Sequence, residues 1–239
     1  MLKQSNDPIY LKDASFAKRL LFLICAIFIA FCFSFATGLV TSLYEQNVYI
    51  SIILGIIVML FYVGFAYFLY RSWQNISVDY DFRKKALFTK SNIRLLGIAI
   101  VIMFLVHYLV SFMDKNSTII LEKNWFTIIS VLIFQVVLAP IIEEVLCRGI
   151  FLSIFFKKEI KILSRFNFNP LIANMILGSI TSAYISTILH GISSWPVLIT
   201  LFTNGLLASF LYYKSKHVAS SIVFHFINNA IAWISFIII

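Results

Sequence analysis

The sequence is poor in charged residues, in cysteine and in the two residues that usually mark loops. Only 12% of the 239 residues are charged, about half the share found in ordinary soluble domains. The three cysteines, Cys25, Cys32 and Cys147, all lie inside apolar stretches, so we expect neither a disulfide framework nor a Cys-x-x-Cys metal or redox motif. With 8 glycines and 4 prolines, the chain is not a low-complexity sequence either. These shortages exclude a soluble globular domain and a disulfide-bonded secreted scaffold.

Apolar residues make up 61% of the chain and aromatic residues 17%. This composition predicts an all-α fold: a polytopic integral membrane bundle of about seven transmembrane helices around a membrane-embedded polar cavity. We divide it into residues 1–124, with about three spans and a basic cytoplasmic loop, and residues 125–239, with about four spans that carry the catalytic core. The expected spans are 20–44, 49–70, 95–113, 126–156, 170–190, 195–213 and 217–239.

The basic residues gather in alternate loops. The N-terminal segment and the loops after the second, fourth and sixth spans hold nearly all of the lysines and arginines outside the spans, whereas the other loops hold only Lys115 and Lys123. By the positive-inside rule the N-terminus is cytoplasmic and the C-terminus external. The rule also accounts for the formal net charge of +9, so we expect the lipid bilayer, and no nucleic acid, as the partner of these charges.

Three charged residues interrupt the apolar run of the fourth span: Glu143, Glu144 and Arg148. Such charges near a helix centre together oppose insertion by about 7–10 kcal/mol. Glu144 and Arg148 are four residues apart and share a helical face, where an ion pair offsets part of this cost. Glu143 points about 100° away and has no local cation, which leaves it available for chemistry. The alternative is a buried ion network with a purely structural role.

The other ionisable residues of the spans are histidines. His190 ends the fifth span, and His225 lies four residues before Asn229 on one face of the last span. An imidazole and a carboxamide at this spacing can donate to one point, as an oxyanion site requires, or can hydrogen-bond two helices together. His107 has no polar partner at helical spacing and is predicted to be structural or interfacial.

Several catalytic classes lack their residues here. The sequence has no His-Glu-x-x-His motif, no aspartate in a span and no Gly-x-Ser-Gly motif, which argues against intramembrane zinc, aspartyl and rhomboid proteases. The spacing of the glutamates and histidines matches no compact metal-ligand motif, and Arg148 would compete with a dication for Glu144. We therefore expect no cofactor and disfavour a divalent metal.

Three motifs together resemble a known family. They are Glu143-Glu144-x-x-x-Arg148, Leu189-His190-Gly191 and His225-x-x-x-Asn229. Over residues 125–235 the sequence looks like the CAAX-protease and bacteriocin-processing (CPBP, or Abi) intramembrane glutamate proteases. It departs from them at Ser186, where an aromatic residue commonly stands four positions before the histidine.

The resemblance implies peptide-bond hydrolysis by an intramembrane endopeptidase that needs no covalent nucleophile. In these terms Glu143 is the general base, His190 assists it, and His225 with Asn229 stabilises the oxyanion. Glu144 and Arg148 position the first carboxylate or the peptide.

Two other readings stay open beside the protease. One is a bacteriocin-immunity or scaffold protein with the same pocket, and the other is a small proton-coupled transporter. The expected partner is a peptide or protein substrate at the membrane, and the expected location is a bacterial plasma membrane. The identity of the substrate and the oligomeric state do not follow from the sequence.

Straight spans place His190 near the outer surface and Glu143 nearer the middle of the membrane. The alternative is that the chain from Asn167–Pro170 onward runs along or dips into the membrane before the fifth helix, which places His190 deeper.

Overall fold

The computed structural model describes residues 14–76, 89–113, 124–156, 170–190, 194–215 and 217–238. Within these ranges the regular structure is helical and contains no strand. Seven helical stretches are long and apolar enough to cross a membrane, and they overlap the seven predicted spans. The predicted fold class is therefore confirmed. The basic segment 77–88 and the connection 157–169 lie outside the described residues.

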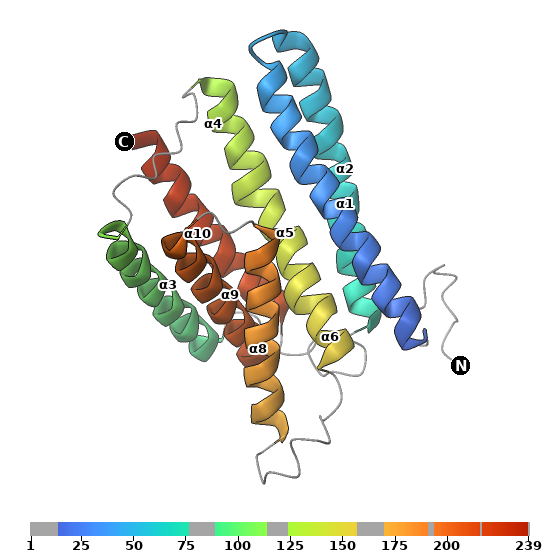
Figure 1. Cartoon of the computed structure of the whole chain (residues 1–239), viewed down its shortest axis with the longest axis vertical. Helices are drawn as coiled ribbons and strands as arrows, with labels where there is room; N and C mark the ends of the chain where they lie inside the picture. Colours follow the sequence, from blue (N-terminus) through green and yellow to red (C-terminus); the bar gives the residue numbers. More distant parts are fainter. Residues whose placement is uncertain are drawn as a thin grey trace.

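The helices run alternately up and down along the bundle (Figure 1). The first three are α1 (Phe16–Leu43), α2 (Val48–Ile76) and α3 (Lys90–Ser111), and the last three are α8 (Pro170–Leu189), α9 (Trp195–Ser215) and α10 (Val218–Ile238). Between them one continuous span comprises α4 (Trp125–Val131), η3 (Leu132–Leu138), α5 (Ala139–Glu144), η4 (Val145–Ile150) and α6 (Phe151–Phe155).

Two segments of this continuous span, η3 and η4, are π-helical. A π-helix uses i→i+5 hydrogen bonds. Such helices are rare in proteins, and those that occur are frequently found at functional sites. The N–H of Ala139 reaches back five residues to the carbonyl of Phe134, and Pro140 follows without an N–H to donate. Pro140 lies in the first turn of α5, and the structure shows a wider helical register on both sides of this segment.

The outer faces of α1, α2 and α3 carry large apolar side chains that the protein does not cover. Examples are Phe28, Phe35, Leu60 and Phe104, each more than half exposed. Such faces suit a hydrocarbon solvent. Inside, Trp73 of α2 is buried against η4, where a Cβ added to Gly149 would lie 2.8 Å from its Cδ1 atom. Gly149 thus permits the close approach of α2 to the polar span.

The helix α3 packs on α9 and α10. His107 Nε2 lies 2.9 Å from Asn228 Oδ1 of α10. This interhelical hydrogen bond satisfies two polar groups that would otherwise face lipid. It agrees with the structural role predicted for His107, which finds its partner across helices rather than along its own.

Candidate active site

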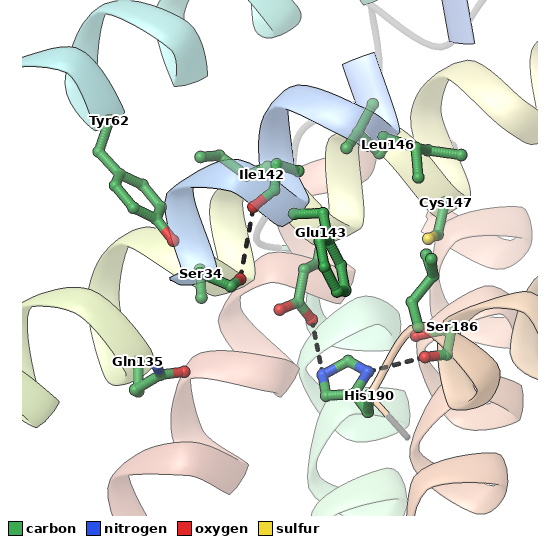
Figure 2. Close-up of a pocket in the computed structure, with 14 residues that line it drawn as sticks. Ser34, Tyr62, Gln135, Ile142, Glu143, Leu146, Cys147, Ser186 and His190 are labelled. Carbon is green, nitrogen blue, oxygen red and sulfur yellow. Dashed lines mark hydrogen bonds and ion pairs between the residues drawn. The ribbon is translucent and has the colours of Figure 1, made fainter. Parts of the chain in front are cut away.

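The carboxylate of Glu143 faces a pocket of about 260 Å³ between the span that carries it and helices α1 and α8. The pocket walls combine apolar side chains of α1 with polar groups of η3, α5 and the end of α8 (Figure 2). The Glu143 side chain is 29% exposed, whereas the Glu144 side chain is 0% exposed. Of the two adjacent glutamates, only Glu143 can therefore meet a substrate or a water molecule in this pocket.

His190 is the nearest partner of Glu143. Its Nε2 atom lies 3.2 Å from Glu143 Oε2, and its Nδ1 atom lies 2.7 Å from the Ser186 carbonyl oxygen. A carbonyl oxygen only accepts, so Nδ1 is the donor to Ser186. A hydrogen bond across the 3.2 Å contact then requires one proton, carried either by His190 as imidazolium or by Glu143 as an acid. The pair is suited to holding a proton at the pocket.

The depth of His190 differs from the expectation of straight spans. The C-terminal end of α8 lies at the level of α5, part-way along the bundle, while α4 begins well above it (Figure 1). His190 therefore lies beside Glu143, because α8 ends inside the bundle, next to the middle of the longer polar span.

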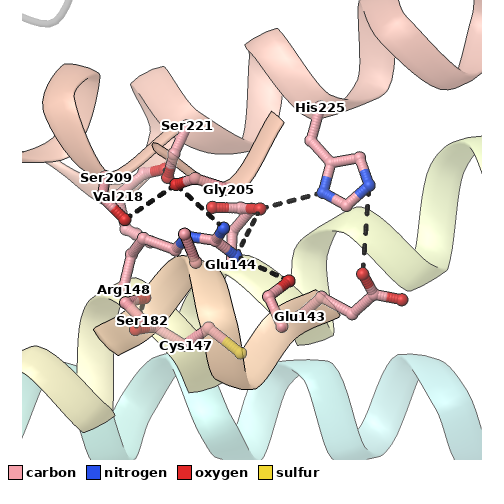
Figure 3. A network of polar contacts seen from close by, with 12 residues as sticks. Glu143, Glu144, Cys147, Arg148, Ser182, Gly205, Ser209, Val218, Ser221 and His225 are labelled. Atoms are coloured by element: carbon pink, nitrogen blue, oxygen red, sulfur yellow. Dashed lines mark hydrogen bonds and ion pairs between the residues drawn. The ribbon is translucent and has the colours of Figure 1, made fainter. Parts of the chain in front are cut away.

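Glu144 and Arg148 form the predicted i,i+4 ion pair, with Arg148 Nη1 lying 3.0 Å from Glu144 Oε1. Both side chains are 0% exposed. Arg148 also donates to Ser186 Oγ at 3.4 Å and to the Gly205 carbonyl at 3.2 Å (Figure 3). A Cβ at Gly205 would lie 2.7 Å from Ala183 Cα and 3.1 Å from Arg148 Nη2. Glycine at position 205 is thus needed for this contact between α8, α9 and the polar span.

His225 links the two glutamates. Its Nδ1 atom lies 2.9 Å from Glu144 Oε1, and its Nε2 atom lies 3.9 Å from Glu143 Oε2 (Figure 3). Because Glu144 is an ion partner of Arg148, it accepts the hydrogen bond, and Nδ1 carries the proton. The 3.9 Å separation is too long for a direct hydrogen bond but suits one water molecule bonded to both groups.

Asn229 lies on α10 with His225 but has a different partner. Its Nδ2 atom donates to the Gln135 carbonyl oxygen at 2.9 Å. In the π register the N–H that would bond this carbonyl belongs to position 140, which is proline. Asn229 therefore supplies the donor that the helix lacks. One of its two amide hydrogens is engaged in this way, and its predicted role at the oxyanion stays a prediction.

The sequence reading missed three polar groups that line the same pocket: Ser34 of α1, Tyr62 of α2 and Gln135 of η3. Gln135 is the one with a visible signal, since it is a lone carboxamide in the apolar run Leu132–Leu138. Ser34 and Tyr62 come from helices outside the predicted motifs, and only the packing of α1 and α2 brings them here. Among the described residues, no group of three or more His, Cys, Asp or Glu side chains is arranged to hold a metal ion.

Residues 124–231, which include every predicted site residue, match the family described as "Type II CAAX prenyl endopeptidase Rce1-like". This segment of the chain is therefore similar to the Rce1-like family. The resemblance to the CAAX-protease family is thereby confirmed for this segment, and the family supports a hydrolase of the CAAX-protease type in an integral membrane protein. Helices α1 and α2, which complete the pocket wall, lie outside the matched residues. Neither the curated proteins nor the solved structures contain a significant match to the chain.

Proposed function

We propose that the Rce1-like domain is an intramembrane endopeptidase in which Glu143 activates a water molecule for attack on a peptide bond. The observation that carries this proposal is the unequal exposure of the two glutamates. Glu143 faces the pocket beside two imidazoles, while Glu144 is fully buried against Arg148. A general base must lie within reach of the water that it deprotonates, and Glu143 is the carboxylate so placed.

The proposed reaction has two stages. Water bonded to Glu143 attacks the peptide carbonyl carbon, its proton passes to the Glu143–His190 pair, and a tetrahedral oxyanion forms. The proton then moves to the leaving nitrogen, the C–N bond breaks, and a carboxylic acid and an amine are released. His225 Nε2 and the second amide hydrogen of Asn229 stabilise the oxyanion, where such a donor contributes about 2.7–4 kcal/mol.

Glu144 and Arg148 receive a different role from the one predicted from the sequence alone. Glu144 Oε1 accepts from both Arg148 and His225 Nδ1, so we infer that it orients the imidazole. A buried carboxylate on the far nitrogen of a histidine also stabilises the imidazolium form, which His225 needs in order to donate from Nε2. Arg148 keeps Glu144 ionised and anchors it to α8 and α9.

We propose that the reaction proceeds without a metal ion. The guanidinium of Arg148 lies 3.0 Å from the Glu144 carboxylate and already neutralises its charge, so that this carboxylate is a poor ligand for a dication. The substrate is a peptide or protein at the membrane. The α1 side of the pocket is apolar, with Ile27, Ala30 and Phe31, so we infer an apolar group beside the scissile bond.

We also propose a bacterial plasma membrane as the location, with the N-terminus cytoplasmic and the C-terminus external. The partition of lysine and arginine between the loops supports this orientation. A reporter fused after Ile239 is expected to report the outer side of the membrane. Cytoplasmic behaviour of that reporter would contradict the orientation.

The substitutions His225→Ala and Asn229→Ala are each expected to lower kcat by roughly 10²–10³-fold with little change in KM, because their hydrogen bonds strengthen in the transition state. The double variant should lose less than the two single losses combined. The measurement is steady-state cleavage of a fluorogenic peptide by the purified protein, with and without a chelator. The chelator should not change the rate of cleavage.

The matched control for this experiment is Asn228→Ala. Asn228 is the neighbour of Asn229 but bonds His107 away from the pocket, so its loss should cost about 0.6 kcal/mol of stability and leave kcat unchanged. Losses confined to KM would point to peptide holding without hydrolysis, as in a scaffold or immunity protein. Activity lost to the chelator and restored by one divalent ion would overturn the metal-free mechanism.

A further inference from the structure

The side chain of Gln135 is exposed on the polar span and lines the pocket together with Glu143 and His190. Among the described residues, the carboxamide of Gln135 has no hydrogen-bond partner. A polar side chain in a membrane-spanning helix is costly when it faces lipid and usually faces a cavity or another helix. Gln135 faces a cavity that Glu143 also lines (Figure 2).

The π register of η3 places Gln135 on this side of the helix. Gln135 and Glu143 are eight residues apart, which in a regular α-helix sets their side chains about 80° apart. An i→i+5 register turns the chain less per residue and so reduces this offset over Leu132–Leu138. As a result, the two side chains share one pocket.

The main chain at Gln135 is held independently of its side chain. Asn229 of α10 donates to the Gln135 carbonyl oxygen at 2.9 Å, so a residue of the candidate site fixes the point from which the carboxamide projects. Such external support is what a binding group requires if it is to keep its position without a substrate. An apolar side chain at position 135 would be equally compatible with contact to lipid and with the helix.

We propose that Gln135 is a substrate-positioning residue that hydrogen-bonds the main chain of the bound peptide beside the scissile bond. A carboxamide offers one acceptor and two donors, and so matches both the N–H and the C=O of a peptide group. It neither gives nor takes a proton at neutral pH, so its contribution lies in binding and register. The inference rests on the proposed peptidase function and adds the main chain of the substrate as the feature recognised.

The test is Gln135→Leu in the full-length protein, with Val137→Leu as the matched control. Val137 lies on the same π-helix and is exposed, but it does not line this pocket. We expect Gln135→Leu to raise KM about ten-fold, as for one lost hydrogen bond, and to change kcat less than two-fold. The control should change neither constant, and both variants should keep the thermal midpoint of the parent.

A series of peptides methylated at one backbone nitrogen at a time separates hydrogen bonding from shape. One methylation should weaken binding to the parent about ten-fold and have no further effect on Gln135→Leu. If no position shows this coupling while the parent cleaves the unmodified peptide, the inference is wrong and the proposed function stands. If the parent binds the peptides and cleaves none, the proposed function fails, and the methylation series, read as binding, still decides whether Gln135 contacts the main chain.

Discussion

Glu143→Gln is expected to lower kcat for peptide cleavage by roughly 10²–10⁴-fold, the contribution of a well-placed general base. The amide keeps the size of the side chain but cannot take the proton of the attacking water. Because Glu143 is partly exposed to the pocket and is not part of the buried ion pair, the variant should insert, fold and melt like the parent. Its affinity for an uncleaved peptide should change little.

The measurement compares cleavage, peptide binding and thermal midpoint for the parent and the variant. Cys147→Ala serves as the chemical control, because Cys147 is buried one turn after Glu143 and a thiol nucleophile would make it essential. It should retain most of the activity. Full activity of Glu143→Gln would remove Glu143 as the base, whereas a parent that binds peptide and never cleaves it would make the chain a binding or immunity module.

Glu144→Gln is expected to destabilise the protein by about 3–5 kcal/mol, the usual effect of removing one partner of a buried ion pair. Arg148 is 0% exposed, and its remaining partners, Ser186 Oγ and the Gly205 carbonyl, are neutral. Activity should fall as well, because His225 loses the carboxylate on Nδ1. A lowered thermal midpoint together with lowered kcat distinguishes this variant from Glu143→Gln.

The double variant Glu144→Gln/Arg148→Met separates the two effects. Replacing both charges by neutral groups of similar size removes the stranded cation, and such replacements are often neutral or stabilising. The thermal midpoint should therefore recover much of its loss, while kcat stays low because His225 remains without its carboxylate. Recovery of kcat together with stability would show that Glu144 acts through folding alone and would contradict its proposed role in orienting His225.

Much of the architecture was predictable from local properties of the chain. A helix that crosses hydrocarbon must be long and apolar wherever it lies in the sequence, so the seven spans could be read before any packing was known, and the structure confirms them. The pairing of Glu144 with Arg148 was equally local, since a spacing of four residues brings side chains together on any helix. The resemblance to the CAAX-protease family also followed from the motifs of three spans and their order, and the match of residues 124–231 confirms it for that segment.

Only the tertiary structure decided how these groups meet. The contact of His190 with Glu143 depends on where α8 ends inside the bundle, and the contact of His225 with Glu144 depends on how α10 packs against the polar span. The pairing of Asn229 with Gln135 arises from a π register, which has no fixed sequence period and which contacts between helices help to stabilise. The sequence by itself determined which polar groups enter the membrane, because each has a local cost there. Which of them form partners was decided by packing between distant helices, because no local spacing encodes those distances.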